Sequence, residues 1–166
     1  MISGFIDDGV VDMTGLVCEK KTLSDKDGVF LGLGDKDDDE MKRIEDFWEF
    51  IFENDNNGSL MGCSVAGGGV ESKVIIDGVN VGILQGHAYA INDVIELPGK
   101  TNGKRNFHRL LRIRNPWGKG EWNGKWSDES DEIISNRAKV QAYIDELEEE
   151  ERFAIGEDDG TFLINY

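Results

Sequence analysis

Apolar and polar residues alternate along two neighbouring stretches of the chain, and this pattern predicts two β-strands. The first covers residues 87–91 and is extended by the apolar pair 94–95. The second covers residues 107–113, which are rich in aromatic and branched side chains. The polar, glycine-containing stretch 98–103 between them is typical of a hairpin loop. We therefore expect the two strands to pair antiparallel about a turn near Thr101.

This pairing places His87, at the start of the first strand, opposite Asn115, at the end of the second. An asparagine oxygen that accepts the proton of one imidazole nitrogen leaves the other nitrogen to serve a thiol as base and then as acid. The same two residues could instead be a structural histidine beside a turn asparagine. Long loops fix register poorly, so a slip of two or more residues is compatible with the pattern.

The rest of the pattern predicts an α+β fold. Apolar residues at three- and four-residue spacing indicate a helix over residues 38–54, and residues 131–152 are expected to be partly helical. Further strands are predicted at residues 59–65, 73–76, 79–84 and 161–164, and short extended pieces at 15–19 and 29–31. Together these give a mostly antiparallel, strongly bent sheet of about six strands, with the 38–54 helix packed on one face.

Composition and charge narrow the class of protein. A length of 166 residues suggests one domain, and a hydrophobic content of 39% suffices for an ordinary core. The net charge of −16 argues against nucleic acid and anionic membranes as partners. No apolar run is long enough to span a membrane, and the first residues show no secretory signal. Two cysteines and no signal point to a reducing, intracellular and cytoplasmic location.

Three motifs follow one another in a fixed order, and together they carry a family resemblance. They are Gly-His-Ala-Tyr at 86–89, Arg-Ile-Arg-Asn-Pro-Trp-Gly at 112–118, and Glu-Trp-x-Gly-x-Trp-Ser-Asp at 121–128. This series closely resembles the second half of the protease core in calpains, which are calcium-dependent, papain-like cysteine proteases. Weaker similarity at 11–15, 47–49, 60–64 and 157–162 extends the likeness over nearly the whole chain. The resemblance implies a barrel-like, bent sheet, the right-hand half of a papain-like fold.

The resemblance also implies roles for three of these residues. His87 would be the general base and Asn115 the residue that orients it. Trp117 would be the indole that shields their hydrogen bond from water. A scaffold without chemistry has no need of all three.

The nucleophile of the family is missing from this sequence. In calpains the catalytic cysteine lies on a helix in the preceding half-domain, together with a glutamine of the oxyanion hole. Cys18 and Cys63 both lie in apolar, extended contexts that do not lower a thiol pKa. We therefore expect residues 1–166 to be one protease subdomain, a fragment of a larger protein. Its partners would be the Cys-bearing half and protein substrates, and it would be inactive alone.

Two acidic loops are candidates for a calcium site. Glu121 and Asp128 lie on a loop rich in tryptophan and glycine, and a second acidic loop follows at 157–160. Ca²⁺ takes six to eight oxygen ligands, which two converging loops can supply. The resemblance places the side chains of Glu121, Asp128 and Asp159, with the backbone carbonyl of Glu157, around one ion. The family usually has a glutamate where Thr161 stands here, and its neutral hydroxyl is a poorer ligand.

Two other functions remain open on the sequence alone. The chain could be a non-catalytic module that senses calcium or binds a partner. It could also be an acidic domain whose motif residues merely pack.

Overall fold

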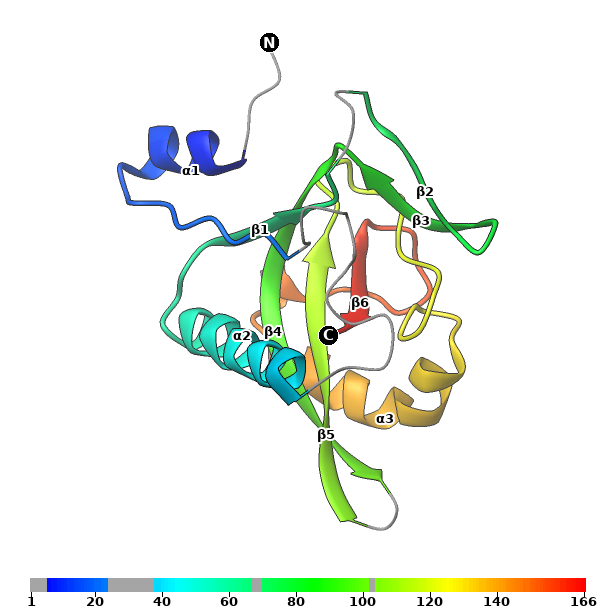
Figure 1. The fold of residues 1–166 in the computed structure, drawn as a ribbon. Helices are drawn as coiled ribbons and strands as arrows, with labels where there is room; N and C mark the ends of the chain where they lie inside the picture. Colours follow the sequence, from blue (N-terminus) through cyan, green and yellow to red (C-terminus); the bar gives the residue numbers. More distant parts are fainter. Residues whose placement is uncertain (1–5, 24–37, 67–69, 102–103) are drawn as a thin grey trace. The chain divides into compact units, whose positions relative to one another are not determined.

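The computed structural model describes residues 6–23, 38–66, 70–101 and 104–166, and it confirms the α+β class (Figure 1). Its helices are α1 (Ile6–Thr14), α2 (Asp38–Asn56) and α3 (Asp131–Glu146), followed by the short 3₁₀ helix η1 (Glu149–Glu151). Its strands are β1 (Met61–Ser64), β2 (Ser72–Ile76), β3 (Val79–Gln85), β4 (Ala88–Thr101), β5 (Lys104–Arg114) and β6 (Thr161–Asn165). The chain forms two compact units, Met1–Asn57 and Gly58–Tyr166, and all six strands belong to the second.

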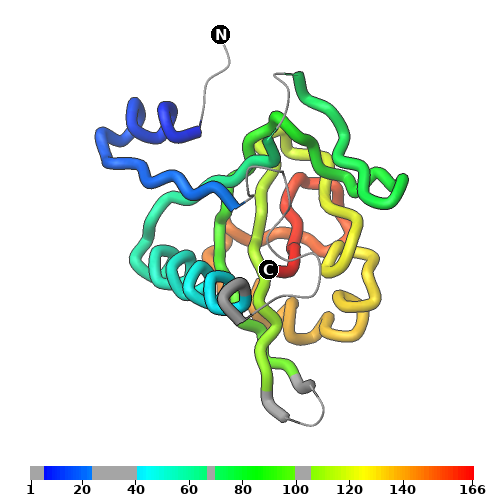
Figure 2. The backbone as a smooth tube through the Cα atoms, in the orientation of Figure 1, coloured from blue at the N-terminus to red at the C-terminus, as the bar shows by residue number. Residues whose placement is uncertain are grey.

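The strands of the second unit divide between two antiparallel sheets. Four of them form a sheet in the order β1-β4-β5-β6, and β2 and β3 form a separate two-stranded ribbon. The two long strands β4 and β5 run side by side over most of their length (Figure 2). The predicted number of strands is therefore right, but they do not form one sheet, and no barrel closes within the described residues.

Alternation along the strands gives the four-stranded sheet two apolar faces. On one face, α3 packs through Ile133, Val140 and Ile144 against a buried cluster to which β4, β5 and β6 contribute. The other face carries a smaller cluster of Tyr89, Ile113 and Phe162. The acidic chain thus has a core on both faces of one sheet, and His87 and Asn115 lie at the edge of that sheet where β4 begins and β5 ends.

The register of the β4–β5 hairpin differs from the prediction. The observed pairs run from Ala90↔Arg114 to Thr101↔Lys104, with an irregularity between Ile91 and Asp93. Residues 98–101, predicted as loop, are strand because they pair with residues 104–107 and so shorten the connection. Residues 102–103 at its tip lie outside the described part of the chain.

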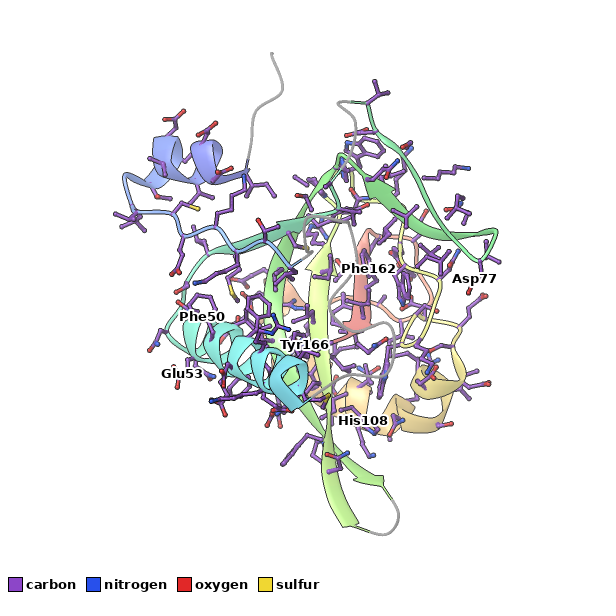
Figure 3. All side chains as sticks on the ribbon, in the orientation of Figure 1. Phe50, Glu53, Asp77, His108, Phe162 and Tyr166 are labelled. Carbon is purple, nitrogen blue, oxygen red and sulfur yellow. The ribbon has the colours of Figure 1, made fainter. Side chains whose placement is uncertain are left out.

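The β2–β3 ribbon is a tight hairpin that reaches back to the main sheet. Its turn is Asp77-Gly78, and both residues have positive φ (50° and 80°), which suits the type of two-residue turn that matches strand twist (Figure 3 labels Asp77 at this turn). A parallel bridge between Val65 and Gln85 links the ribbon to the residue after β1. Residues 67–69, between β1 and β2, lie outside the described residues.

The first unit holds one confirmed and one unpredicted helix. The helix predicted at 38–54 is α2, which continues for two more residues. Aromatic rings stack along it at three- and four-residue spacing, Phe47 on Phe50 and Trp48 on Phe52. The packing of this helix on the sheet stays a prediction.

The extended piece predicted at 15–19 is wrong, because residues 15–23 form neither helix nor strand. The helix α1 precedes them and ends where Gly15, at φ 68°, donates its amide to the Val11 carbonyl. The strand predicted at 29–31 falls outside the described residues. None of the described helices is long and apolar enough to cross a membrane.

Candidate active site

The structure brings the predicted histidine and asparagine together. His87 lies one residue before β4 and Asn115 one residue after β5, and the distance from His87 Nε2 to Asn115 Oδ1 is 2.9 Å. Both side chains are buried, with 5% and 2% of their surface exposed. The contact forms despite the shifted register because both residues lie beyond the paired ends of the strands.

The orientation of the Asn115 amide is fixed by its other partners. Its nitrogen donates to the carbonyls of Lys119 and Gly120, at 2.7 and 3.0 Å. Its oxygen accepts the Trp117 backbone amide at 3.1 Å as well as facing His87. Because the oxygen can only accept, Nε2 of His87 must be the donor of their bond. The imidazole is thus held in a known orientation and carries a proton on Nε2.

Two aromatic side chains surround the imidazole. The ring of Trp117 lies 4.5 Å from that of His87, centroid to centroid, and the ring of Tyr89 meets it edge-on at 4.9 Å. The Tyr89 hydroxyl accepts the backbone amide of Leu84 at 2.9 Å, which fixes this second ring. Trp117 remains 54% exposed, so its indole covers the imidazole on one side and faces outward on the other.

A carboxylate that the sequence did not predict lies within hydrogen-bond distance of the other imidazole nitrogen. Glu71 Oε1 lies 2.8 Å from His87 Nδ1. Glu71 immediately precedes β2, so its contact depends on how the β2–β3 ribbon folds back, and no spacing rule in the sequence signals it. Both ring nitrogens of His87 therefore have oxygen partners.

Neither cysteine of the chain lies in a setting that activates a thiol. Cys63 lies on β1 opposite Tyr89, and burial raises the pKa of its thiol to about 11. Cys18 is exposed, outside any helix or strand. A thiol whose pKa is raised is a poor nucleophile, so Cys63 is not a candidate for the reacting sulfur.

The two acidic loops converge. The backbone amide of Gly160 donates to Glu121 Oε1 at 2.8 Å, and that of Gly120 donates to Asp158 Oδ1 at 2.6 Å. A third bond joins the Gly156 amide to the Asp128 carboxylate. Three separate hydrogen bonds thus connect the loop at 120–128 to the loop at 156–160.

Convergence places like charges near one another. Burial and, to a smaller extent, the charges of Asp128, Asp159 and Asp158 raise the pKa of Glu121 to about 7, against the opposing effect of the Gly160 hydrogen bond. Burial also raises the pKa of Asp128, with Asp159 contributing. A cation among these groups would relieve their repulsion.

The donors suit calcium but are not assembled into a coordination shell. All of them are carboxylate or carbonyl oxygens, the ligands that Ca²⁺ prefers. Asp159 Oδ1 accepts the Thr161 amide at 2.7 Å, and the Glu157 carbonyl accepts the Asp159 amide at 2.8 Å. Within the described residues, no three His, Cys, Asp or Glu side chains are gathered closely enough to hold a metal ion.

Thr161 is not available as a substitute ligand in this arrangement. It is buried, and its hydroxyl accepts a hydrogen bond from Arg114 Nη1 at 2.9 Å. This bond places a positive charge at the position where the family usually has a glutamate. Thr161 is therefore not a candidate metal ligand in this arrangement.

Comparisons with known proteins all point to one family. The model of the calpain family of cysteine proteases matches residues 1–166. Calpain-9 of Mus musculus is 36% identical over 128 residues, which is 74% of this chain and 16% of that protein. Calpain-5 of Mus musculus is 30% identical over 164 residues, 96% of this chain and 22% of that protein. Calpain-14 of Homo sapiens is 29% identical over 140 residues, 83% and 16% respectively.

The chain spans less than a quarter of the length of these relatives. The match nevertheless covers both motif-bearing strands and both acidic loops, because the family model extends over the whole sequence. On this evidence the chain belongs to the calpain family of cysteine proteases.

Proposed function

We propose that this chain is the His/Asn-bearing half of a calcium-dependent cysteine endopeptidase. The observation that carries the proposal is the buried 2.9 Å contact between His87 Nε2 and Asn115 Oδ1, in a chain of the calpain family. In this proposal His87 is the general base and Asn115 orients it. Trp117, 4.5 Å from the imidazole, shields their bond from water.

The chemistry proposed for His87 uses its second nitrogen. A thiol supplied by the Cys-bearing half loses its proton to Nδ1, and the thiolate attacks the carbonyl carbon of a peptide bond. His87 then returns that proton to the leaving amine as the C–N bond breaks. Water, deprotonated by the same nitrogen, hydrolyses the thioester and releases the thiol. Asn115 holds Nε2 throughout, so only Nδ1 takes part in proton transfer.

We propose further that the two acidic loops form a calcium site. Glu121, Asp128 and Asp159 would hold the ion with their carboxylates, and Glu157 with its backbone carbonyl. Bound calcium supplies positive charge that cancels repulsion among these groups and draws the two loops together. The raised pKa of Glu121 supports the site, because a partly buried group of like charges is stabilised by a counter-ion. Its carboxylates would have to turn from their present amide donors.

The partners and location follow from the same proposal. The Cys-bearing half would belong to the same longer protein, and the substrates would be proteins. Both cysteines of this chain are free, which supports a reducing, cytoplasmic setting. Residues 1–166 would be a single protease subdomain without activity of its own.

Activity of the longer protein tests the catalytic proposal. With Ca²⁺ and a fluorogenic peptide, the longer protein should cleave the peptide, whereas residues 1–166 should not. His87→Ala should abolish the activity, and Asn115→Ala should reduce it by roughly two to three orders of magnitude. Asp46→Ala, on the exposed face of α2, is a matched control that should leave it unchanged. A longer protein that binds calcium and cleaves nothing would favour the calcium-sensing or partner-binding scaffold.

Calorimetry tests the calcium site separately. Titration of residues 1–166 with Ca²⁺ should give a binding heat that Asp128→Ala weakens by at least about tenfold in Kd, because one charged ligand is lost. Asp46→Ala again serves as the control. An absence of binding heat in the wild-type chain would end the calcium proposal.

A further inference from the structure

The proposed chemistry needs Nδ1 of His87, and this nitrogen already has a hydrogen-bond partner. Glu71 Oε1 lies 2.8 Å from His87 Nδ1, while Asn115 Oδ1 lies 2.9 Å from Nε2. Glu71 and His87 come from different sheets, since Glu71 precedes β2 of the ribbon and His87 precedes β4 of the main sheet. The contact is therefore made between two structural elements and not within one.

Hydrogen-bond donors and acceptors decide where the protons lie. Asn115 Oδ1 can only accept, because the amide nitrogen of the same side chain is held by two carbonyls. A carboxylate also accepts only, so the Glu71 contact requires a proton between Oε1 and Nδ1. Whether that proton is assigned to the ring or to Glu71, the Nδ1 lone pair is engaged. A base engaged in this way cannot take a proton from a thiol.

We propose that Glu71 is a placeholder for the thiolate: its carboxylate occupies Nδ1 of His87 and must withdraw before the sulfur can pair with the imidazole. This inference rests on the proposed function, because it assumes that a thiol reaches Nδ1. A carboxylate and a thiolate carry the same charge, so Glu71 stabilises the buried imidazole in the same way while the sulfur is absent. The arrangement keeps the base from acting before the two halves meet.

The surroundings of the imidazole support this role. The other groups in contact with the ring are Tyr89, Trp117 and Asn115, all uncharged at neutral pH. Glu71 thus supplies the negative charge in contact with His87 among the described residues. His87 is 5% exposed, but the Glu71 side chain is 40% exposed, so the carboxylate can leave toward solvent while the ring stays in place.

The attachment of Glu71 allows such a withdrawal. Its neighbour Ser72 is the first residue of β2, pairs with Gln85 and accepts a bond from the Gln85 side chain at 2.5 Å. On the other side, Val70 is 78% exposed and belongs to no helix or strand. Rotation of the Glu71 side chain therefore requires no break in the pairing of β2 with β3.

A carboxylate beside a histidine can also act as an orienting group. Here the orientation is already fixed through Nε2 by Asn115 and by the flanking rings, and Glu71 holds the one nitrogen that remains. The two roles predict opposite results. Removal of an orienting group lowers the activity, whereas removal of a placeholder raises it.

The contact itself is tested on residues 1–166 by NMR of ¹⁵N-labelled imidazoles at pH 6.5. The chain has two histidines, so His108 serves as an internal reference. In the wild-type chain the Nδ1 signal of His87 should show the hydrogen bond to Glu71, and in Glu71→Ala this signal should move from its wild-type position while Nε2 keeps its proton. Glu146→Ala, an exposed carboxylate on α3, is the matched control and should leave both rings unchanged. Identical His87 signals in the wild type and in Glu71→Ala would overturn the proposal.

The competition with sulfur is tested in the longer protein. Glu71→Ala should raise kcat/KM by about tenfold, near the lower end of what a hydrogen bond to a charged group is worth. Glu71→Gln, which keeps the shape but not the charge, should fall between the wild type and Glu71→Ala. Wild-type activity that Glu71→Ala lowers or leaves unchanged would overturn the placeholder and leave the proposed function intact. Absence of activity in every variant, with the NMR result as expected, would overturn both and reduce Glu71 to a counter-ion of His87.

Discussion

Asn115 and Gly160 are joined by a backbone hydrogen bond of 2.7 Å, and the amide of the same glycine donates to Glu121 at 2.8 Å. One residue therefore contacts both the asparagine that holds His87 and the first carboxylate of the acidic loops. The candidate calcium ligands and the candidate catalytic pair are not independent parts of the fold. A change in the position of Gly160 would therefore displace both Asn115 and Glu121.

A substitution at Gly160 should be costly for two reasons. Its φ is 85°, and an added Cβ would lie 2.8 Å from the Lys119 nitrogen and 2.9 Å from the Gly118 carbonyl carbon. Gly160→Ala should lower the free energy of unfolding by about 3 kcal/mol, as strain and overpacking add. Gly58→Ala is the control, since its φ is 74° but nothing lies within 4 Å, and it should cost only about 1 kcal/mol. Equal losses in urea denaturation would contradict the role of close packing.

Asn115 should matter for stability as well as for chemistry. Asn115→Leu keeps the size of the side chain but leaves two carbonyls and the Trp117 amide without their side-chain partner. We expect the free energy of unfolding to fall by at least about 2 kcal/mol, the cost of buried groups left unpaired. The exposed Asn92, replaced by Leu, provides the control. If the two variants unfold at the same urea concentration, the bonds of Asn115 do not stabilise the fold.

Arg112, on β5, forms a buried polar network with Asp93, Tyr143 and Glu151. Its guanidinium pairs with Asp93 at 2.8 Å and donates to the Glu151 carbonyl at 2.6 Å, and Tyr143 donates to the same aspartate. Because Arg112 is 3% exposed, Asp93→Asn should lower the free energy of unfolding by about 3 kcal/mol by leaving a buried charge uncompensated.

A double-mutant cycle measures the pairing directly. Arg112→Met combined with Asp93→Asn should destabilise less than the sum of the two single changes, by about 1–3 kcal/mol. The exposed pair of Lys21 and Glu19 supplies the comparison, and Glu19→Ala should cost less than about 1 kcal/mol. Strict additivity of the Arg112 and Asp93 changes would show that the network contributes no coupling.

The two thiols should differ in reactivity. Burial raises the pKa of Cys63 to about 11, so less of its thiolate forms at pH 8 than for an ordinary cysteine. Cys18 is exposed and should be alkylated by iodoacetamide at least about tenfold faster than Cys63, whose burial limits both access and thiolate formation. Mass spectrometry of the labelled chain measures both rates, and unfolding in urea should make them equal. Fast labelling of native Cys63 would contradict the burial.

The sequence pattern predicted the elements that carry a regular period. α2, the β2–β3 hairpin with its Asp77-Gly78 turn, and β6 all lie close to their predicted bounds. These elements have a clear apolar stripe or alternation, or turn residues that only one backbone geometry accepts. The family resemblance, carried by three motifs in order, is likewise confirmed by the match over residues 1–166.

Other features depend on interactions that no local pattern contains. α1 was missed because Ile6–Thr14 is only nine residues long and buries none of them, although Asp7 and Asp8 in its first turn are a signal that suits a helix start. The hairpin register was misplaced because residues 98–101 look like loop but pair as strand. The Glu71 contact arises only when the ribbon folds beside the main sheet, across sixteen residues of chain.

Gly86 is the residue at which the chain passes from the ribbon to the main sheet. It separates Gln85, the last residue of β3, from His87, and it adopts a φ of 73°. The imidazole therefore takes its place from the strands that follow it, whereas the acid that faces it takes its place from the hairpin before it. If His87 and Glu71 have the roles proposed for them, exchange of that hairpin between relatives would change the restraint on His87 without changing His87 itself, so the timing of activation and the catalytic rate could evolve separately.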